Sequence, residues 1–146
     1  MKTSDAGLHL IIEREGNKTH AYLDSVGVWT IGVGHTGPEV HSGLVWTDAQ
    51  VMDALRKDIQ RFEKAVNDAV TIELDQYQFD ALVSFAFNVG ETAFKTSTLV
   101  RKLNAGDLDG AAGQFDMWHI PPEITSRRNG EREQFKGTAL QARIAA

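Results

Sequence analysis

The chain has 146 residues and no cysteine, so a single domain can bury its core without a disulfide framework, and a thiol nucleophile is excluded. Hydrophobic residues make up 42% of the sequence and charged residues 24%, and no segment approaches the ~20 apolar residues of a membrane-spanning helix. The net charge is −5, but the segment from Thr125 to Ala146 carries +3, a basic excess that is small by the standards of nucleic-acid-binding surfaces.

The first predicted element is a helix over residues 4–15. A capping residue precedes its apolar stripe, and Gly16 is placed to end it. Glu15 lies seven residues after Leu8 and therefore shares the apolar face, whereas Glu13 lies well round the helix. Burial on that face would favour the protonated form of Glu15, because desolvation disfavours a charged carboxylate.

Residues 21–33 are predicted to form a β-hairpin. β-favouring residues flank a turn-forming stretch that begins at Asp24. On the second strand Thr30 and Gly32 share one face, so Thr30 is expected to point away from Trp29. Asp24, placed in a polar turn, is expected to stay ionised.

The remainder of the chain is helical in pattern. A capping-box sequence at Thr47 predicts a long helix over residues 47–68 that connects the hairpin region to a helical lobe. Later helices are predicted over 75–90, from Thr96 or Ser97, from Asp107 until Pro121-Pro122, and over about 126–135.

The sequence as a whole predicts one mainly helical domain of the α+β class. Its expected parts are a small hairpin lobe (about 16–46), the connecting helix (about 47–68), and a helical lobe (about 69–146 together with helix 4–15). No internal repeat or low-complexity segment divides the chain further.

Glu15 and Asp24 match the two carboxyl environments that glycoside hydrolysis requires. One carboxylic acid is held protonated to donate to the leaving oxygen, and a second carboxylate acts across the sugar. The local pattern also permits a structural interpretation, in which Glu15 is a helix-end residue and Asp24 a turn former. These residues by themselves leave both interpretations open.

A longer pattern favours the catalytic interpretation. The run from Glu15 through Asp24 and Thr30 to His35, with spacings of nine and six residues between the first three, resembles the catalytic segment of phage-type lysozymes of glycoside hydrolase family 24. The resemblance continues through Gln78–Gly90, Ser97-Thr-Leu, Leu103-Asn104, Gly106-Asp107, Trp118 and Arg127-Arg128-x2-Glu131, and departs from the family pattern at Ile120–Ile124. It therefore covers nearly the whole chain.

The resemblance implies a lysozyme-like fold and the activity of an endolysin. Such a muramidase hydrolyses the β-1,4 bond between N-acetylmuramic acid and N-acetylglucosamine in peptidoglycan. By this resemblance Glu15 is the general acid, Asp24 orients or activates water, and Thr30 helps to hold that water. A hydroxyl at position 30 suits an inverting mechanism, in which a water molecule fits between the base and the sugar.

Three further residues are candidates for substrate binding by the same resemblance, namely Gly32, Asn88 and Arg127. The family pattern and the local charge also make Arg127 a candidate partner for Glu15. Trp29, Trp46 and Trp118 can stack on sugar rings, although tryptophan in so small a domain is usually part of the core.

Metal and nucleotide sites are not supported by the sequence. The glycines of Gly32–Gly37 match G-x-G-x-x-G, but Pro38 follows, and no βαβ unit surrounds the motif. None of the five histidines has the spacing of a metal site, so neither a metal nor a cofactor is expected. His35 is expected to anchor the loop after the hairpin through a hydrogen bond.

The expected partner is the glycan strand of peptidoglycan, bound by a monomer without nucleic acid or a stable membrane anchor. Some family members carry a membrane-inserting N-terminal segment that is not seen here, so release from the host cytoplasm would depend on a separate pore-forming protein. Two alternatives remain open: a lytic transglycosylase on the same fold, and a non-catalytic module that only binds peptidoglycan.

Overall fold

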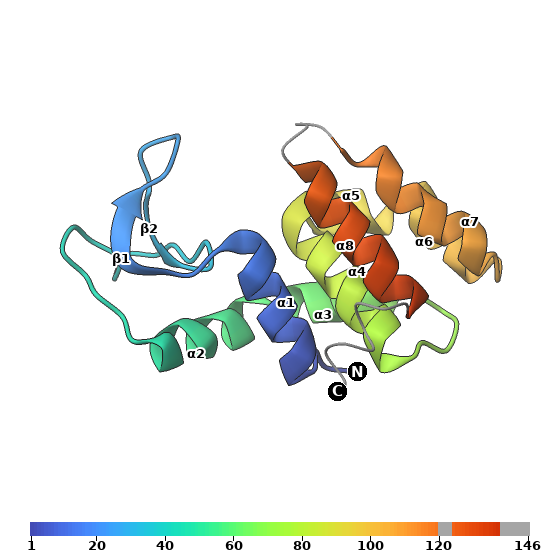
Figure 1. Ribbon diagram of the computed structural model, residues 1–146, viewed down its shortest axis with the longest axis horizontal. Coiled ribbons are helices and arrows are strands. Elements are labelled where there is room, and N and C mark those ends of the chain that lie inside the picture. Colours follow the sequence, from blue (N-terminus) through green and yellow to red (C-terminus); the bar gives the residue numbers. More distant parts are fainter. Residues whose placement is uncertain (120–123, 138–146) are drawn as a thin grey trace. The chain divides into compact units, whose positions relative to one another are not determined.

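The computed structural model describes residues 1–119 and 124–137 (Figure 1). Its elements are α1 (Asp5–Glu15), β1 (Lys18–Leu23), β2 (Trp29–Gly32), α2 (Asp48–Asp58), α3 (Gln60–Ala69), α4 (Gln76–Val89), α5 (Glu91–Lys95), α6 (Thr98–Asn104), α7 (Leu108–Gln114), the 3-10 helix η1 (Phe115–Met117) and α8 (Thr125–Lys136). The predicted α+β class is confirmed. The Pro121-Pro122 stop and any helix beyond Gly137 lie outside the described residues.

The chain divides into two compact units. The hairpin unit is Leu8–Gln60, and the helical unit comprises Met1–Gly7 together with the residues from Arg61 onward. The hairpin unit holds most of α1, both strands and α2. The helical unit holds α4 to α8 and all but the first residue of α3.

The single helix predicted over residues 47–68 is wrong, because α2 ends at Asp58 and α3 begins at Gln60. Between them Ile59 has φ −80° and ψ −10°, and its N–H is shared between the carbonyl oxygens of Leu55 and Lys57. The buried stripe formed by Val51, Leu55, Ile59, Phe62 and Val66 nevertheless runs without a gap through both helices. Hydrophobic periodicity therefore cannot detect this local change in ψ.

In the hairpin unit β1 and β2 pair antiparallel, with Tyr22 opposite Thr30 and Leu23 opposite Trp29. The turn that joins the strands begins at Asp24, as predicted. α2 packs against β2 and begins with a complete capping box between Thr47 and Gln50. The buried apolar residues of this unit are Leu8, Leu10, Ile11, Ile31, Val33, Val40, Val51, Leu55 and Ile59.

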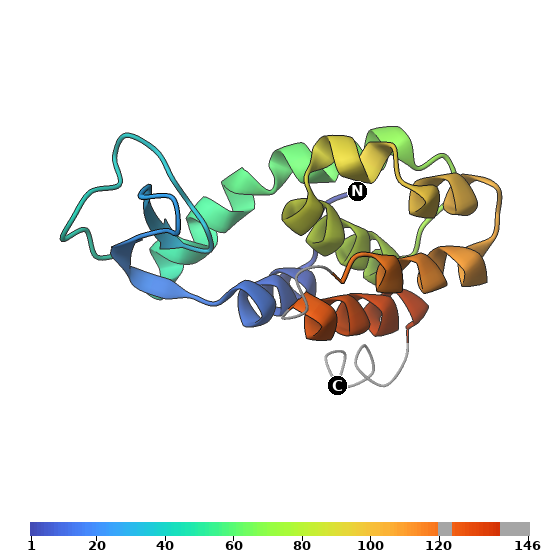
Figure 2. The same ribbon diagram turned by 90° about the horizontal axis from the view of Figure 1, so that it is seen from above.

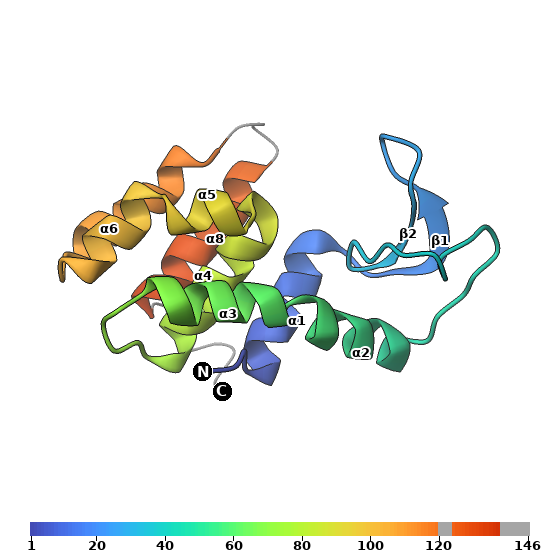
Figure 3. The ribbon, with the colours of Figure 1, turned by 180° about the vertical axis from the view of Figure 1, so that it is seen from behind.

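The helical unit is built around α4, which is buried from Phe79 to Ala86. α8 runs alongside α4 (Figure 2), and α6 lies beside α7 (Figures 1 and 3). The ring of Phe85 meets three further aromatic rings edge-on, those of Phe94, Phe115 and Trp118. The predicted helix over 75–90 is confirmed, whereas the five-residue helix α5 was not predicted, because it is too short to show a period.

The start of α1 is bound to α4 through Asp80. The Asp80 carboxylate accepts hydrogen bonds from the Ser4 amide and hydroxyl and from the side-chain amide of Gln76. A Cβ on Gly7 would lie 2.6 Å from the Asp80 carboxyl carbon, so glycine is required for this close approach. Burial raises the pKa of Asp80 despite these hydrogen bonds.

Candidate active site

Asp24 organises the hairpin turn through its backbone and one carboxylate oxygen. Oδ1 accepts the N–H groups of Val26 at 2.9 Å and Val28 at 2.8 Å, and the Asp24 N–H donates to the Val28 carbonyl at 3.0 Å. Gly27 closes the turn with φ +83°, a left-handed conformation that favours glycine. Among the residues that the structure describes, none hydrogen-bonds to Oδ2 of Asp24. The carboxylate is therefore held through one oxygen, and the other is available.

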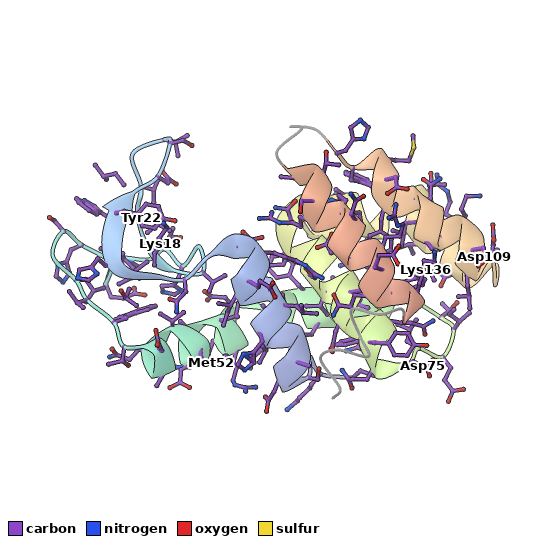
Figure 4. The ribbon with its side chains drawn as sticks, in the orientation of Figure 1. Lys18, Tyr22, Met52, Asp75, Asp109 and Lys136 are labelled. Atoms are coloured by element: carbon purple, nitrogen blue, oxygen red, sulfur yellow. The ribbon has the colours of Figure 1, made fainter. Side chains whose placement is uncertain are left out.

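Thr30 lies on the same face of the hairpin as Asp24. It is opposite Tyr22, which Figure 4 labels on β1. Asp24 directly follows β1, and its N–H still pairs with the Val28 carbonyl, so the alternation of side chains continues to Asp24 and puts it on the side of Tyr22. Asp24 and Thr30 are thus diagonal neighbours, while Trp29 takes the opposite face as predicted. The Thr30 side chain is buried, and its hydroxyl donates to the Val28 carbonyl at 2.9 Å. The lone pairs of that hydroxyl remain as acceptors.

Glu15 is the last residue of α1. The N–H of Gly16 donates to the Ile12 carbonyl at 2.8 Å, and its φ of +86° turns the chain out of the helix. Glu15 is exposed, although Leu8 and Ile11 on the same stripe are buried. The expectation that the protein itself buries Glu15 is wrong, because the apolar stripe loses its cover at the end of the helix.

The three predicted catalytic residues belong to one unit. Glu15 ends α1, Asp24 starts the turn and Thr30 lies on β2, all within Leu8–Gln60. Asn88 near the end of α4 and Arg127 in the first turn of α8 belong to the helical unit, and both side chains are half-buried. Their predicted contacts with substrate stay predictions.

Gly32 has a structural reason to be glycine. Its φ is +68°, and a Cβ at this buried position would lie 3.3 Å from the Trp46 ring and 3.5 Å from Val51. A side chain there would be strained by its backbone conformation and crowded by its neighbours. Packing therefore accounts for this residue, and its predicted role in substrate binding is still a prediction.

His35 joins the loop after the hairpin to α2, as predicted. Its Nδ1 lies 2.7 Å from Oδ2 of Asp58, and its Nε2 lies 2.6 Å from Oε1 of Glu39. The imidazole also lies against Trp46, with 5.3 Å between ring centroids. Burial lowers the pKa of His35, but the hydrogen bonds to Glu39 and Asp58 outweigh it, so the pKa lies above its ordinary value of 6.5.

The raised pKa predicts how stability depends on pH. Since the folded state binds the His35 proton more tightly, this contribution is complete below about pH 6.5 and is lost as the pH rises through the folded-state pKa. We expect the melting temperature of the wild type to fall as the pH rises from about 6.5 through the folded-state pKa of His35. His35→Gln should abolish the part of this fall that comes from His35. The control His41→Gln alters an exposed histidine and should keep the wild-type slope. Equal slopes for the wild type and His35→Gln would contradict the prediction.

Comparison with known proteins agrees with the predicted fold and family. The profile of the phage lysozyme family matches residues 12–131. The chain belongs to the phage lysozyme family. It is 38% identical over 143 residues to the endolysin of Salmonella phage P22, and the match covers 92% of this chain and 98% of that one.

A second relative is longer than this chain. The endolysin of Bacillus phage B103 is 40% identical over 142 residues, but the match covers 92% of this chain and 54% of that protein. This chain therefore spans about half the length of the B103 endolysin. The fold of this chain is similar to the crystal structure of a P22 lysozyme mutant. The TM-score is 0.89, the sequence identity is 38%, and the match covers 93% of this chain and 99% of that one.

These similarities confirm the predicted enzyme class, a glycoside hydrolase of the lysozyme type, at the level of the family. Within the described residues of this phage lysozyme, no helix has the length and apolar character needed to cross a membrane. The described part of the chain also holds no group of three or more His, Asp or Glu side chains arranged for a metal ion.

One residue of this phage lysozyme that sequence reasoning missed is Arg128. Its fully buried guanidinium forms an ion pair with Glu131, donates to the side-chain oxygen of Asn88, and donates from Nε to the Trp118 carbonyl at 3.0 Å. Ser84 on α4 donates to the other carboxylate oxygen of Glu131 at 2.6 Å. The signal was present in the sequence, because Arg128 and Glu131 are three residues apart on one helix.

Proposed function

We propose that this phage lysozyme is an inverting muramidase that cleaves the β-1,4 bond between N-acetylmuramic acid and N-acetylglucosamine. Glu15 acts as the general acid, and Asp24 and Thr30 position and activate water. The observation that carries the proposal is the hydrogen bonding at the hairpin turn, which occupies Oδ1 of Asp24 and the proton of Thr30 and leaves Oδ2 and the Thr30 oxygen as acceptors. A non-catalytic binding module has no need of a carboxylate and an acceptor hydroxyl side by side.

The hydrogen bonds of the two residues explain how a water molecule would be oriented. The Thr30 hydroxyl donates its hydrogen bond to the Val28 carbonyl, so the hydroxyl oxygen is left to accept a hydrogen bond from the water. Oδ2 of Asp24 accepts the other hydrogen, because Oδ1 is occupied by two backbone amides. The lone pair of the water is then left to attack the anomeric carbon.

The reaction requires one proton transfer at each side of the sugar. The water oxygen bonds to the anomeric carbon, and Asp24 takes the proton that the water gives up. The bond to the glycosidic oxygen breaks, and Glu15 donates its proton to that oxygen. Since Glu15 is exposed, it is the bound glycan strand that excludes water from the acid during the reaction.

Several expectations stay part of this proposal. Gly32, Asn88 and Arg127 are proposed to contact the glycan strand. Residence in the host cytoplasm, monomeric behaviour and release through a separate pore-forming protein also stay predictions.

Mass spectrometry of digested peptidoglycan tests substrate, bond and reaction type together. We expect fragments that end in a reducing N-acetylmuramic acid, because hydrolysis adds one water at each cleaved bond. Ends of 1,6-anhydromuramic acid, one water lighter, would instead establish a lytic transglycosylase. Undigested strands that still bind the protein would establish a binding module and overturn the proposal.

A further inference from the structure

The Arg128 network holds together three separate segments of the helical unit. Arg128 and Glu131 are both 0% exposed, a burial that charged side chains reach only when they are paired. The guanidinium contacts Asn88 on α4 and the carbonyl of Trp118 after η1, and it lies 5.1 Å from the centroid of the Phe85 ring. The Glu131 contacts with Arg128 and Ser84 fix the guanidinium in place.

The contact with Arg128 determines which way the Asn88 amide faces. A guanidinium has donors and no acceptor, so only the amide oxygen of Asn88 can face it. The amide nitrogen must then point to the other side of the trigonal carbon. Within residues 1–119 and 124–137, no side chain or carbonyl accepts a hydrogen bond from Nδ2 of this half-buried residue. Two N–H donors are thus held in a fixed direction.

Stability alone is a weak reason for such a network. The free energy of desolvating two charges is about as large as the free energy of their attraction. Replacing a buried ion pair with apolar side chains therefore often leaves stability unchanged. Orientation is the property that an apolar replacement cannot reproduce. Among the contacts of Arg128 within residues 1–119 and 124–137, the neutral side chain that accepts from it and keeps two donors is the half-buried Asn88.

We propose that Arg128 is a positioning residue that turns the Asn88 amide so that Nδ2 donates to an amide carbonyl oxygen of peptidoglycan. The inference rests on the proposed function, since it names how one residue of that enzyme meets its substrate. Acetamido groups of the sugars and peptide bonds of the stem both present such carbonyl oxygens. Glu131 and Ser84 act one step further away, by holding Arg128.

Asn88→Asp separates the two roles of the side chain. The carboxylate still accepts from Arg128, and more strongly, so the melting temperature should not fall. Both donors are lost, so the apparent KM for peptidoglycan should rise about tenfold with a smaller change in kcat. Asn129→Asp adds the same charge at an exposed position of α8 and should leave KM unchanged. A wild-type KM for Asn88→Asp would overturn the proposal.

Two variants test Arg128 itself. Arg128→Lys keeps a charge beside Glu131 but cannot also reach Asn88 and Trp118, so the folded protein should show the raised KM. The double variant Arg128→Met/Glu131→Gln removes both charges of the buried ion pair. Adding Asn88→Ala to this double variant should raise KM no further, because the Asn88 amide is already without its orienting contact. A wild-type KM in folded Arg128→Lys, or independent effects in the combined variant, would show that Arg128 does not act through Asn88.

Two further comparisons complete the test. Glycan strands stripped of their peptides distinguish the acceptors, because the effect of Asn88→Asp persists there for a sugar acetamido group and disappears for a peptide carbonyl. If the wild-type protein failed to cleave peptidoglycan, the proposed function itself would be wrong. A wild-type enzyme that is active beside a fully active Asn88→Asp variant refutes only the role of Asn88 and Arg128.

Discussion

Glu15→Gln is expected to lose nearly all hydrolysis of peptidoglycan while keeping its melting temperature. The amide preserves the shape of the side chain but has no acidic proton to donate to the glycosidic oxygen. Removing a general acid costs about 10²–10⁴-fold in rate. The clearing of outer-membrane-permeabilised cells gives the rate, and circular dichroism with thermal melting gives the fold.

Glu13→Gln is the matched control, because both glutamates lie on α1 and both are exposed. We expect its rate to be close to that of the wild type. Equal losses in the two variants would mean that the assignment of the acid is wrong. Loss of soluble protein in Glu15→Gln alone would point to a structural role at the end of α1.

Fresh product is expected to carry the α-configuration at the new reducing end, since inversion converts a β-linked substrate into an α-product. Thr30 supports this outcome, because a buried hydroxyl on the same hairpin as Asp24 is suited to hold water and adds nothing to direct attack by the carboxylate. NMR during the first minutes of reaction distinguishes the two anomers. Initial β-product, a glycosyl-enzyme trapped on Asp24 or 1,6-anhydro ends would each refute this mechanism.

The same mechanism predicts a severe loss of rate when the carboxylate of Asp24 is replaced. Asp24→Ala would also remove the acceptor for the amides of Val26 and Val28, so a loss of activity could reflect an altered turn. Asp24→Asn keeps an oxygen for those amides and removes the base. We therefore expect Asp24→Asn to be folded and impaired by about 10²-fold or more, and wild-type activity in it would exclude Asp24 as the base.

The patterns that were predicted correctly are short-range ones. The cap at Thr47, the stop at Gly16 and the turn at Asp24 each depend on a few neighbouring residues. The break at Ile59 escaped prediction because a change in ψ leaves the spacing of buried residues intact. The burial predicted for Glu15 was wrong for a related reason. Helical spacing shows which face of the helix a residue lies on, but it does not show how far along that face other residues pack against it.

The sequence by itself determined the mainly helical α+β class, the family, and the carboxylates and hydroxyl proposed for catalysis, because these depend on residue type and on spacing along the chain. Only the folded structure decided which atoms of those residues, and of Asn88, are already occupied. One oxygen of Asp24 is taken by backbone amides, the Thr30 proton by a carbonyl, and the Asn88 oxygen by Arg128. Hydrogen bonds between segments depend on distance in space, and for Asn88 and Arg128 that contact joins residues 40 positions apart.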